Sequence, residues 1–181
     1  AGGSIVIGAG SSVDSRVGSV KLASSIGNPS GAIKVDTGAG INSHGGAVLL
    51  AGGDFAGTGH AVGTNSNRHG VSIDGATISS GVGSIIIRGK GSETWDDATG
   101  VSINHGAIIS STTGTISIVG QGGSYSGTNA QHGVSIAVGD ISGTTSISTT
   151  SGGISITGTG GDAGDGLRIG PTATIGSTSG D

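Results

Sequence analysis

Acidic residues around the only tryptophan are the first group in the chain that could do chemistry. Glu93, Asp96 and Asp97 surround Trp95. Glycoside hydrolases use a pair of carboxylates, one on each side of the scissile bond, for acid, base and nucleophilic steps. A single loop rarely supplies both carboxylates, and no second carboxylate recurs at the same place in the repeats described below. We therefore expect a solvated acidic loop, with Ca²⁺ binding by Asp96 and Asp97 as the alternative.

A glycine- and aspartate-rich stretch, residues 160–167, resembles the calcium-binding repeat of other parallel β-rolls. It is out of register with that repeat, because Asp162 stands where any residue is tolerated and Ala163 stands where glycine is required. It also occurs once, whereas the calcium-binding repeats occur in tandem. We expect no calcium site in this stretch.

Two histidines, His69 and His132, occupy the same position two residues before a valine, and Asp165 fills that position in a later repeat. If each repeat forms one coil, His132 lies about 5 Å from Asp165. Histidines in non-adjacent repeats do not make a tetrahedral metal site. No Gly-x-Ser-x-Gly motif follows a strand into a helix, so a nucleophilic serine has no support either. We expect no catalytic, cofactor-binding or metal-binding residues.

The three aromatic residues of the chain are Phe55, Trp95 and Tyr125, and each falls in a different glycine-rich segment between repeats. Each ring could cover its own loop as a small apolar cluster. Alternatively, the rings form a lateral ridge that touches a neighbouring chain or a ligand, because Trp and Tyr are favoured at interfaces. These residues are therefore the candidate lateral interface.

The composition excludes several classes of protein. Among 181 residues there are 42 glycines, no cysteine and no methionine, and the formal net charge is −4. The seven basic residues are scattered, whereas a nucleic-acid binder needs them clustered, so we expect no nucleic-acid partner. No apolar run approaches the roughly 18 residues of a membrane span. A chain without methionine that starts at Ala1 is expected to be a processed segment or an excerpt of a longer protein.

A repeated phrase predicts the architecture that positions all these residues. Gly-Val-Ser-Ile occurs at residues 70–73, 100–103 and 133–136, and Gly-Leu-Arg-Ile follows at 166–169. The period is therefore 30 residues (70 to 100), then 33 (100 to 133) and 33 (133 to 166). A constant period of this length indicates an array of one supersecondary unit whose apolar face is buried against its neighbours.

Each repeat contains three strand-length pieces with alternating apolar residues, clearest at 101–103, 107–109 and 115–118. Three short strands and one long loop per repeat predict an all-β fold, a parallel β-solenoid, right-handed by the crossover rule. Aliphatic side chains point inward and stack between coils, and Ser and Thr point outward. We expect one array over residues 1–181, open at both ends and most regular over 70–181.

The third strand of the repeat recurs at 84–87, 115–118 and 153–156, and its pattern also matches residues 4–7, 32–35 and 47–50. On this assignment its outward residues are too mixed for the threonine array of an ice-binding surface, being Val6, Lys34, Leu49, Ile86, Ser117 and Ser155. The last repeat stops before a third strand, and the chain begins with a segment of that form. The ends thus predict either a piece of a longer array or end-to-end stacking into a filament.

The pattern in GVSINHGAIISSTTGTISIVGQGG, residues 100–123, resembles the β-helical repeats of filamentous-haemagglutinin-like large exoproteins and bacterial surface adhesins. The resemblance covers residues 70–175 well and the first seventy residues loosely. It implies an extracellular or cell-surface protein that forms elongated fibres, self-associates and meets a glycan or host surface receptor. We expect a structural or adhesive segment without enzymatic activity. A carbohydrate-binding or carbohydrate-cleaving β-helix is the alternative.

Overall fold

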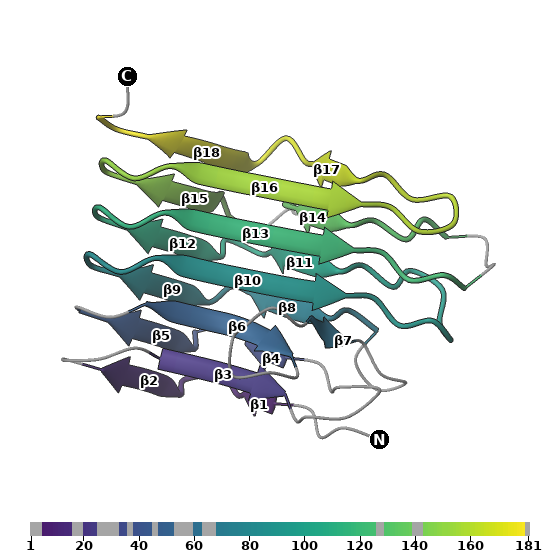
Figure 1. Ribbon diagram of the computed structural model, residues 1–181, viewed down its shortest axis with the longest axis horizontal. Coiled ribbons are helices and arrows are strands. Elements are labelled where there is room, and N and C mark those ends of the chain that lie inside the picture. The colour runs from purple at the N-terminus through teal and green to yellow at the C-terminus, as the bar shows by residue number, and fades with distance from the viewer. Residues whose placement is uncertain are drawn as a thin grey trace.

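The computed structural model describes residues 5–15, 20–24, 33–35, 38–44, 47–52, 60–62, 68–125, 129–138 and 143–179. Within these residues every regular element is a β-strand, and the strands form three parallel sheets (Figure 1). The first sheet contains β1 (Ile5–Ile7), β4 (Ile33–Val35), β8 (Val71–Asp74), β11 (Val101–Asn104), β14 (Val134–Ile136) and β17 (Leu167–Ile169). The second contains β2 (Ser12–Ser15), β5 (Gly40–Ser43), β9 (Thr77–Ser80), β12 (Ile108–Ser111), β15 (Thr145–Thr149) and β18 (Ala173–Ser177). The third contains β3 (Val20–Ser24), β6 (Val48–Gly52), β10 (Ile85–Lys90), β13 (Ile116–Gln121) and β16 (Ile154–Thr159), with β7 (Ala61–Val62) beside β10.

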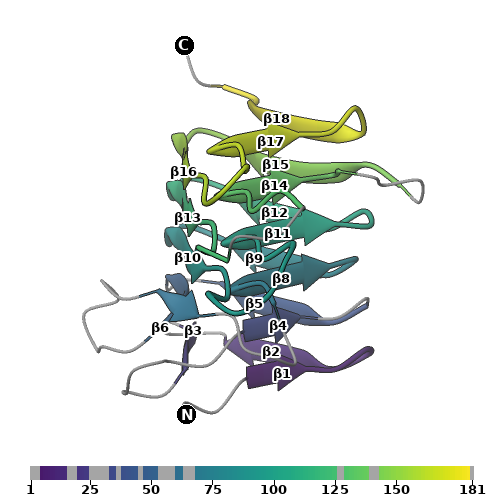
Figure 2. The ribbon, with the colours of Figure 1, turned by 90° about the vertical axis from the view of Figure 1, so that its right-hand side faces the viewer.

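Successive coils stack with their repeats in register, which confirms the predicted parallel β-solenoid. Val71 pairs with Val101, Val101 with Val134, and Val134 with Leu167. The chain passes through the three sheets in turn, and each coil lies directly above the previous one from the N-terminal to the C-terminal end (Figures 1 and 2). Equivalent residues of neighbouring coils are therefore about 4.8 Å apart, the distance between strands in a sheet.

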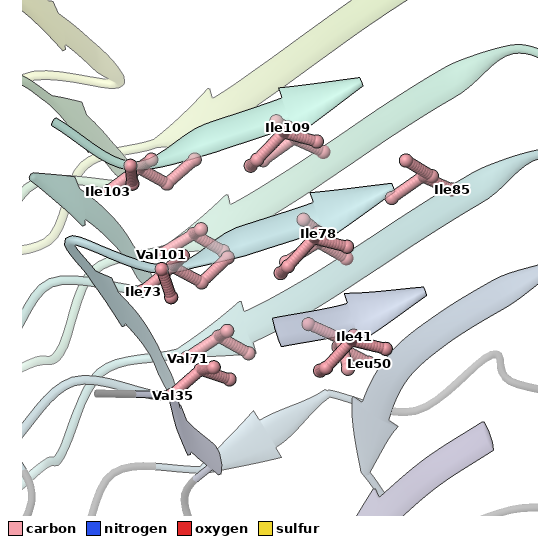
Figure 3. Packing of buried hydrophobic residues seen from close by; sticks show 14 of the residues in the cluster. Val35, Ile41, Leu50, Val71, Ile73, Ile78, Ile85, Val101, Ile103 and Ile109 are labelled. Atoms are coloured by element: carbon pink, nitrogen blue, oxygen red, sulfur yellow. The ribbon is translucent and has the colours of Figure 1, made fainter. Parts of the chain in front are cut away.

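The interior of the coils is a column of branched aliphatic residues. Ile73 and Ile103 from the first sheet and Ile78 and Ile109 from the second face the same interior (Figure 3). All four are fully buried, as are Ile85, Ile87, Ile116 and Ile118 of the third sheet. Because side chains alternate across a strand, one apolar residue in two is enough to fill this narrow core.

Facing glycines explain why the repeated phrase begins with Gly. A Cβ on Gly100 would lie 2.4 Å from the backbone N of Gln121, and a Cβ on Gly120 would lie 2.0 Å from the carbonyl O of Gly133. The ends of β10, β13 and β16 thus touch the starts of first-sheet strands with no room for a side chain. Glycine is required here by close backbone approach rather than by a left-handed conformation.

The first coils correct part of the sequence interpretation. Residues 4–7 and 32–35 were assigned to the third strand of the repeat, but β1 pairs with β4 and β4 pairs with β8, so both belong to the first sheet. The short Ile-x-Ile or Ile-x-Val pattern is common to all three sheets and does not distinguish them. In addition, β7 lies in the segment between β6 and β8 and pairs with the end of β10.

Candidate functional site

The acidic residues around Trp95 are used for structural contacts. The carboxylate of Asp96 accepts two hydrogen bonds from Asn129 of the next loop, from its backbone N–H (2.9 Å) and its side-chain amide (3.0 Å). Glu93 pairs with Lys90 at 2.6 Å, and Asp97 lies 3.7 Å from the Arg68 guanidinium. The hydrogen bond and charge of Lys90 lower the pKa of Glu93, whereas a general acid for sugar cleavage needs a raised one.

Two of the three predicted interface residues lie on successive stacked loops. Trp95 is 47 % exposed and Tyr125 is 43 % exposed. The loops are joined by the Asp96–Asn129 contacts, and the buried side chain of Gln131 donates to the Tyr125 carbonyl and accepts from its N–H. Phe55 lies outside the described residues. The lateral interface of Phe55, Trp95 and Tyr125 stays a prediction.

The two histidines hold neighbouring coils together. The Nδ1 atom of His69 accepts the N–H of Thr99 at 3.2 Å, and the Nδ1 of His132 accepts the N–H of Asp165 at 3.0 Å. Each ring thus reaches the same position one coil further on, and His132 lies beside Asp165 as the repeat predicted, with Nδ1 3.6 Å from the carboxylate. A ring nitrogen that accepts a hydrogen bond must carry no proton, so this contact requires the neutral imidazole.

The surroundings of both rings favour that neutral form. Burial is the main cause that lowers the pKa of His69. The Asp97 carboxylate raises this pKa, and the Arg68 guanidinium lowers it. Burial also lowers the pKa of His132, and the Arg168 guanidinium, 3.0 Å from Nε2, adds to it. Among the described residues, no three His, Asp or Glu side chains lie close enough to hold a metal ion.

A concave surface runs along the second sheet, at a place for which the sequence predicts no site. A groove of ≈ 480 Å³ crosses β5, β9, β12, β15 and the residue after β18. Its walls carry hydroxyl, amide and imidazole groups in two outward columns. One column is Asn42, Ser79, Ser110 and Ser148, and the other is His44, Gly81, Thr112, Thr150 and Thr178.

A third, inward column of hydroxyls shapes this groove. Ser80 donates to the Gly83 carbonyl at 2.6 Å, Ser111 donates to the same carbonyl at 3.2 Å, and Thr149 accepts from the N–H of Gly152 at 3.0 Å. These buried hydroxyls satisfy the backbone where the chain turns from the second sheet into the third. The hydroxyls of Ser80, Ser111 and Thr149 thereby fix the backbone at the corner beside the outward columns.

The groove carries polar groups that repeat along the stacked coils. Five coils at about 4.8 Å per step extend for about 19 Å. Ser79 donates to the Asn42 amide oxygen at 2.7 Å, so neighbouring coils already share hydrogen bonds along one column. The hollow shape suits a chain-like polar molecule better than a flat surface such as a crystal plane. The groove could be found in the sequence only by knowing which residues, about 30 positions apart, lie side by side in neighbouring coils.

No protein-family model, curated protein or solved structure matches the chain. In the part of the chain that the structure describes, no helix is long and apolar enough to cross a membrane.

Proposed function

We propose that this chain is a structural or adhesive segment of an extracellular or cell-surface fibre. The observation that carries the proposal is the stacking of equivalent strands in register through three parallel sheets, so that Val71, Val101, Val134 and Leu167 follow one another. Repeats that contact only their neighbours make an elongated body, which suits a segment of a fibre. In the last described coils Ile154 and Ile156 are partly exposed, whereas the equivalent Ile116 and Ile118 one coil below are fully buried.

Two further features support a structural role over a catalytic one. The carboxylates around Trp95 are engaged by Asn129, Lys90 and Arg68, as described above. The resemblance of residues 100–123 to the repeats of filamentous-haemagglutinin-like exoproteins points to the same class of secreted, elongated proteins. We therefore propose that the chain is a surface adhesin or exoprotein of this type, without enzymatic activity.

The test of this function is self-association of the purified chain. Analytical ultracentrifugation over a hundredfold concentration range, with electron microscopy of the same samples, should show linear assemblies one solenoid wide. The matched control is Ile156→Lys, which places a charge on the open end, beside Ser155→Lys on the outward face of the same strand. Assembly should be lost in the first variant and kept in the second. A particle that stays monomeric at every concentration would argue against the fibre.

A second candidate function is glycan binding, and the hydroxyl groove of the second sheet favours it. Linear polysaccharides present hydroxyl groups at regular intervals and need a long polar groove. Binding to a panel of soluble linear polysaccharides, measured by calorimetry, should be weakened by Ser110→Leu with Thr112→Leu. The matched control is Ser117→Leu, because Ser117 points outward from the third sheet. Equal binding by all variants would exclude the groove.

A further inference from the structure

The walls of the groove along the second sheet are polar but uncharged. The groove crosses β5, β9, β12 and β15, which lie one above another (Figure 1). Among the described residues that line it there is no Asp, Glu, Lys or Arg, and His44 is the only titratable one. Asp14 lies outside the lining, in the coil before His44, with its carboxylate 3.8 Å from the Nδ1 of that ring.

The uncharged lining selects against ionic polymers. A carboxylate or sulfate that left water for the groove would lose its hydration without gaining a cationic partner. An ammonium group would likewise find no carboxylate among the lining residues. The formal net charge of −4 further disfavours a polyanion. The groove is therefore matched to a neutral chain.

Two hydroxyls in the middle of the groove are available to such a chain. Ser79 already donates to the Asn42 amide oxygen at 2.7 Å. The hydroxyls of Ser110 and Ser148, in the same column, have no hydrogen-bond partner among the described residues. A free hydroxyl both donates and accepts hydrogen bonds, as a sugar hydroxyl does. Ser110 and Ser148 can therefore each exchange a bound water for a sugar hydroxyl.

The second column of the groove adds methyl groups beside hydroxyls. Thr112, Thr150 and Thr178 follow one another in it. The Thr178 hydroxyl donates to the Thr150 carbonyl at 3.4 Å. A methyl group makes dispersion contacts with the C–H face of a sugar ring, which a hydroxyl alone does not. The serine column thus offers hydrogen bonds, and the threonine column offers apolar contact next to it.

The coil repeat sets the spacing of these groups. Equivalent side chains recur about every 4.8 Å along the groove. In an extended β-linked sugar chain each unit advances by nearly the same length, so one unit can lie on each coil. A groove about 19 Å long then holds about four units. An α-linked chain that coils helically does not keep this spacing.

We propose that the groove binds a neutral, linear, β-linked polysaccharide that lies along the solenoid axis, with one sugar unit on each coil and hydrogen bonds to Ser110 and Ser148. The proposal rests on glycan binding, the second candidate function named above, and specifies the class of glycan. It predicts that affinity depends on the charge, the linkage and the length of the sugar chain.

Calorimetric titration with defined oligosaccharides tests the class of ligand. The probes are the β-linked hexamers of glucose, mannose and xylose. The α-linked glucose hexamer is the control for linkage, and the β-linked mannuronate hexamer, which differs from the mannose hexamer in its carboxylates, is the control for charge. We expect at least one neutral β-linked hexamer to bind about tenfold or more tightly than either control. Its affinity should rise with length up to about four units and then stay constant.

Two double variants test the site. Ser110→Ala with Ser148→Ala removes the free hydroxyls, and Ser117→Ala with Ser155→Ala is the matched control on the outward face of the third sheet. We expect binding to weaken by at least about fivefold in the first pair and to stay unchanged in the second. Both pairs should melt at the temperature of the unmodified chain, because all four side chains point outward.

The possible failures separate the proposal from the function on which it rests. Equal or tighter binding of the mannuronate or α-linked hexamer overturns the neutral β-linked class, while glycan binding stands. Binding that is unchanged in the Ser110 and Ser148 variant overturns the assigned contacts. Binding of long polysaccharides without any hexamer overturns the match of one unit to one coil. No binding of any hexamer or long polysaccharide overturns the glycan-binding function itself.

Discussion

Truncating one isoleucine in the middle of the third sheet and its neighbour at the open end tests the stacked core directly. Ile118 is fully buried and lies in register between Ile87 below and Ile156 above. Ile156 has the same chemistry and the same place in its strand but is partly exposed. Replacing each by alanine removes the same atoms from two sites that differ only in burial.

The expected losses follow from that difference. Ile118→Ala removes the equivalent of about three buried methylene groups at about 0.8 kcal/mol each, and the cavity left between two rigid coils adds to this. We expect a loss of about 3–4 kcal/mol in the free energy of unfolding. Ile156→Ala should cost about 1–2 kcal/mol, because roughly half of its transfer energy is already absent in the folded monomer.

Urea denaturation followed by far-ultraviolet circular dichroism, at protein concentrations where the chain is monomeric, measures both losses. The slope of the transition should be unchanged, so that the shift of the midpoint reports stability alone. Equal losses in the two variants would refute the continuous column of side chains with one open end. A larger loss at Ile156 would mean that this end is covered.

Three further predictions address the close backbone contacts, the histidines and the exposed ring. Gly120→Ala should destabilise the fold by more than 2 kcal/mol because its Cβ would overlap the Gly133 carbonyl, whereas Gly153→Ala, whose Cβ meets nothing within 4 Å, should be nearly neutral in thermal melts. His69 and His132 have folded-state pKa values below the ordinary 6.5, so the unfolded chain binds more protons and stability is full above about pH 6.5 and falls as the pH is lowered further. Melts from pH 7.5 to 5.0 should show this fall, and it should shrink when both histidines become asparagine, whose amide oxygen accepts the same hydrogen bond without titrating. Trp95→Ala should leave the melting temperature within about 2 °C and weaken any lateral association seen by electron microscopy, and unfolding of this variant would show that the ring belongs to the core.

Much of the fold could be predicted because short stretches of sequence show both the strand pattern and its recurrence. The Val-Ser-Ile strand and the Ile-x-Ile strand each determine which side chains point inward, and the recurrence of the phrase every 30 to 33 residues stacks each strand on its own copy. The position of β1 could not be predicted in this way. Its Ile-x-Ile pattern fits every sheet, and only the choice of β4 as its partner decides among them.

The candidate sites depended even more on distant contacts. The acidic loop was expected to be solvated, but its Asp96 carboxylate accepts hydrogen bonds from Asn129, which lies 33 positions away. The hydroxyl groove was missed because its residues are ordinary outward serines and threonines in any single repeat. They become a surface only when five coils are superposed.

The amino-acid sequence by itself determined that this chain winds into stacked parallel coils, because inward and outward positions follow from alternation and the coil length follows from the period. Only the tertiary structure decided where the coils leave a groove and which loops are joined. These features arise between residues that are far apart in the chain, and each depends on the register in which whole coils meet.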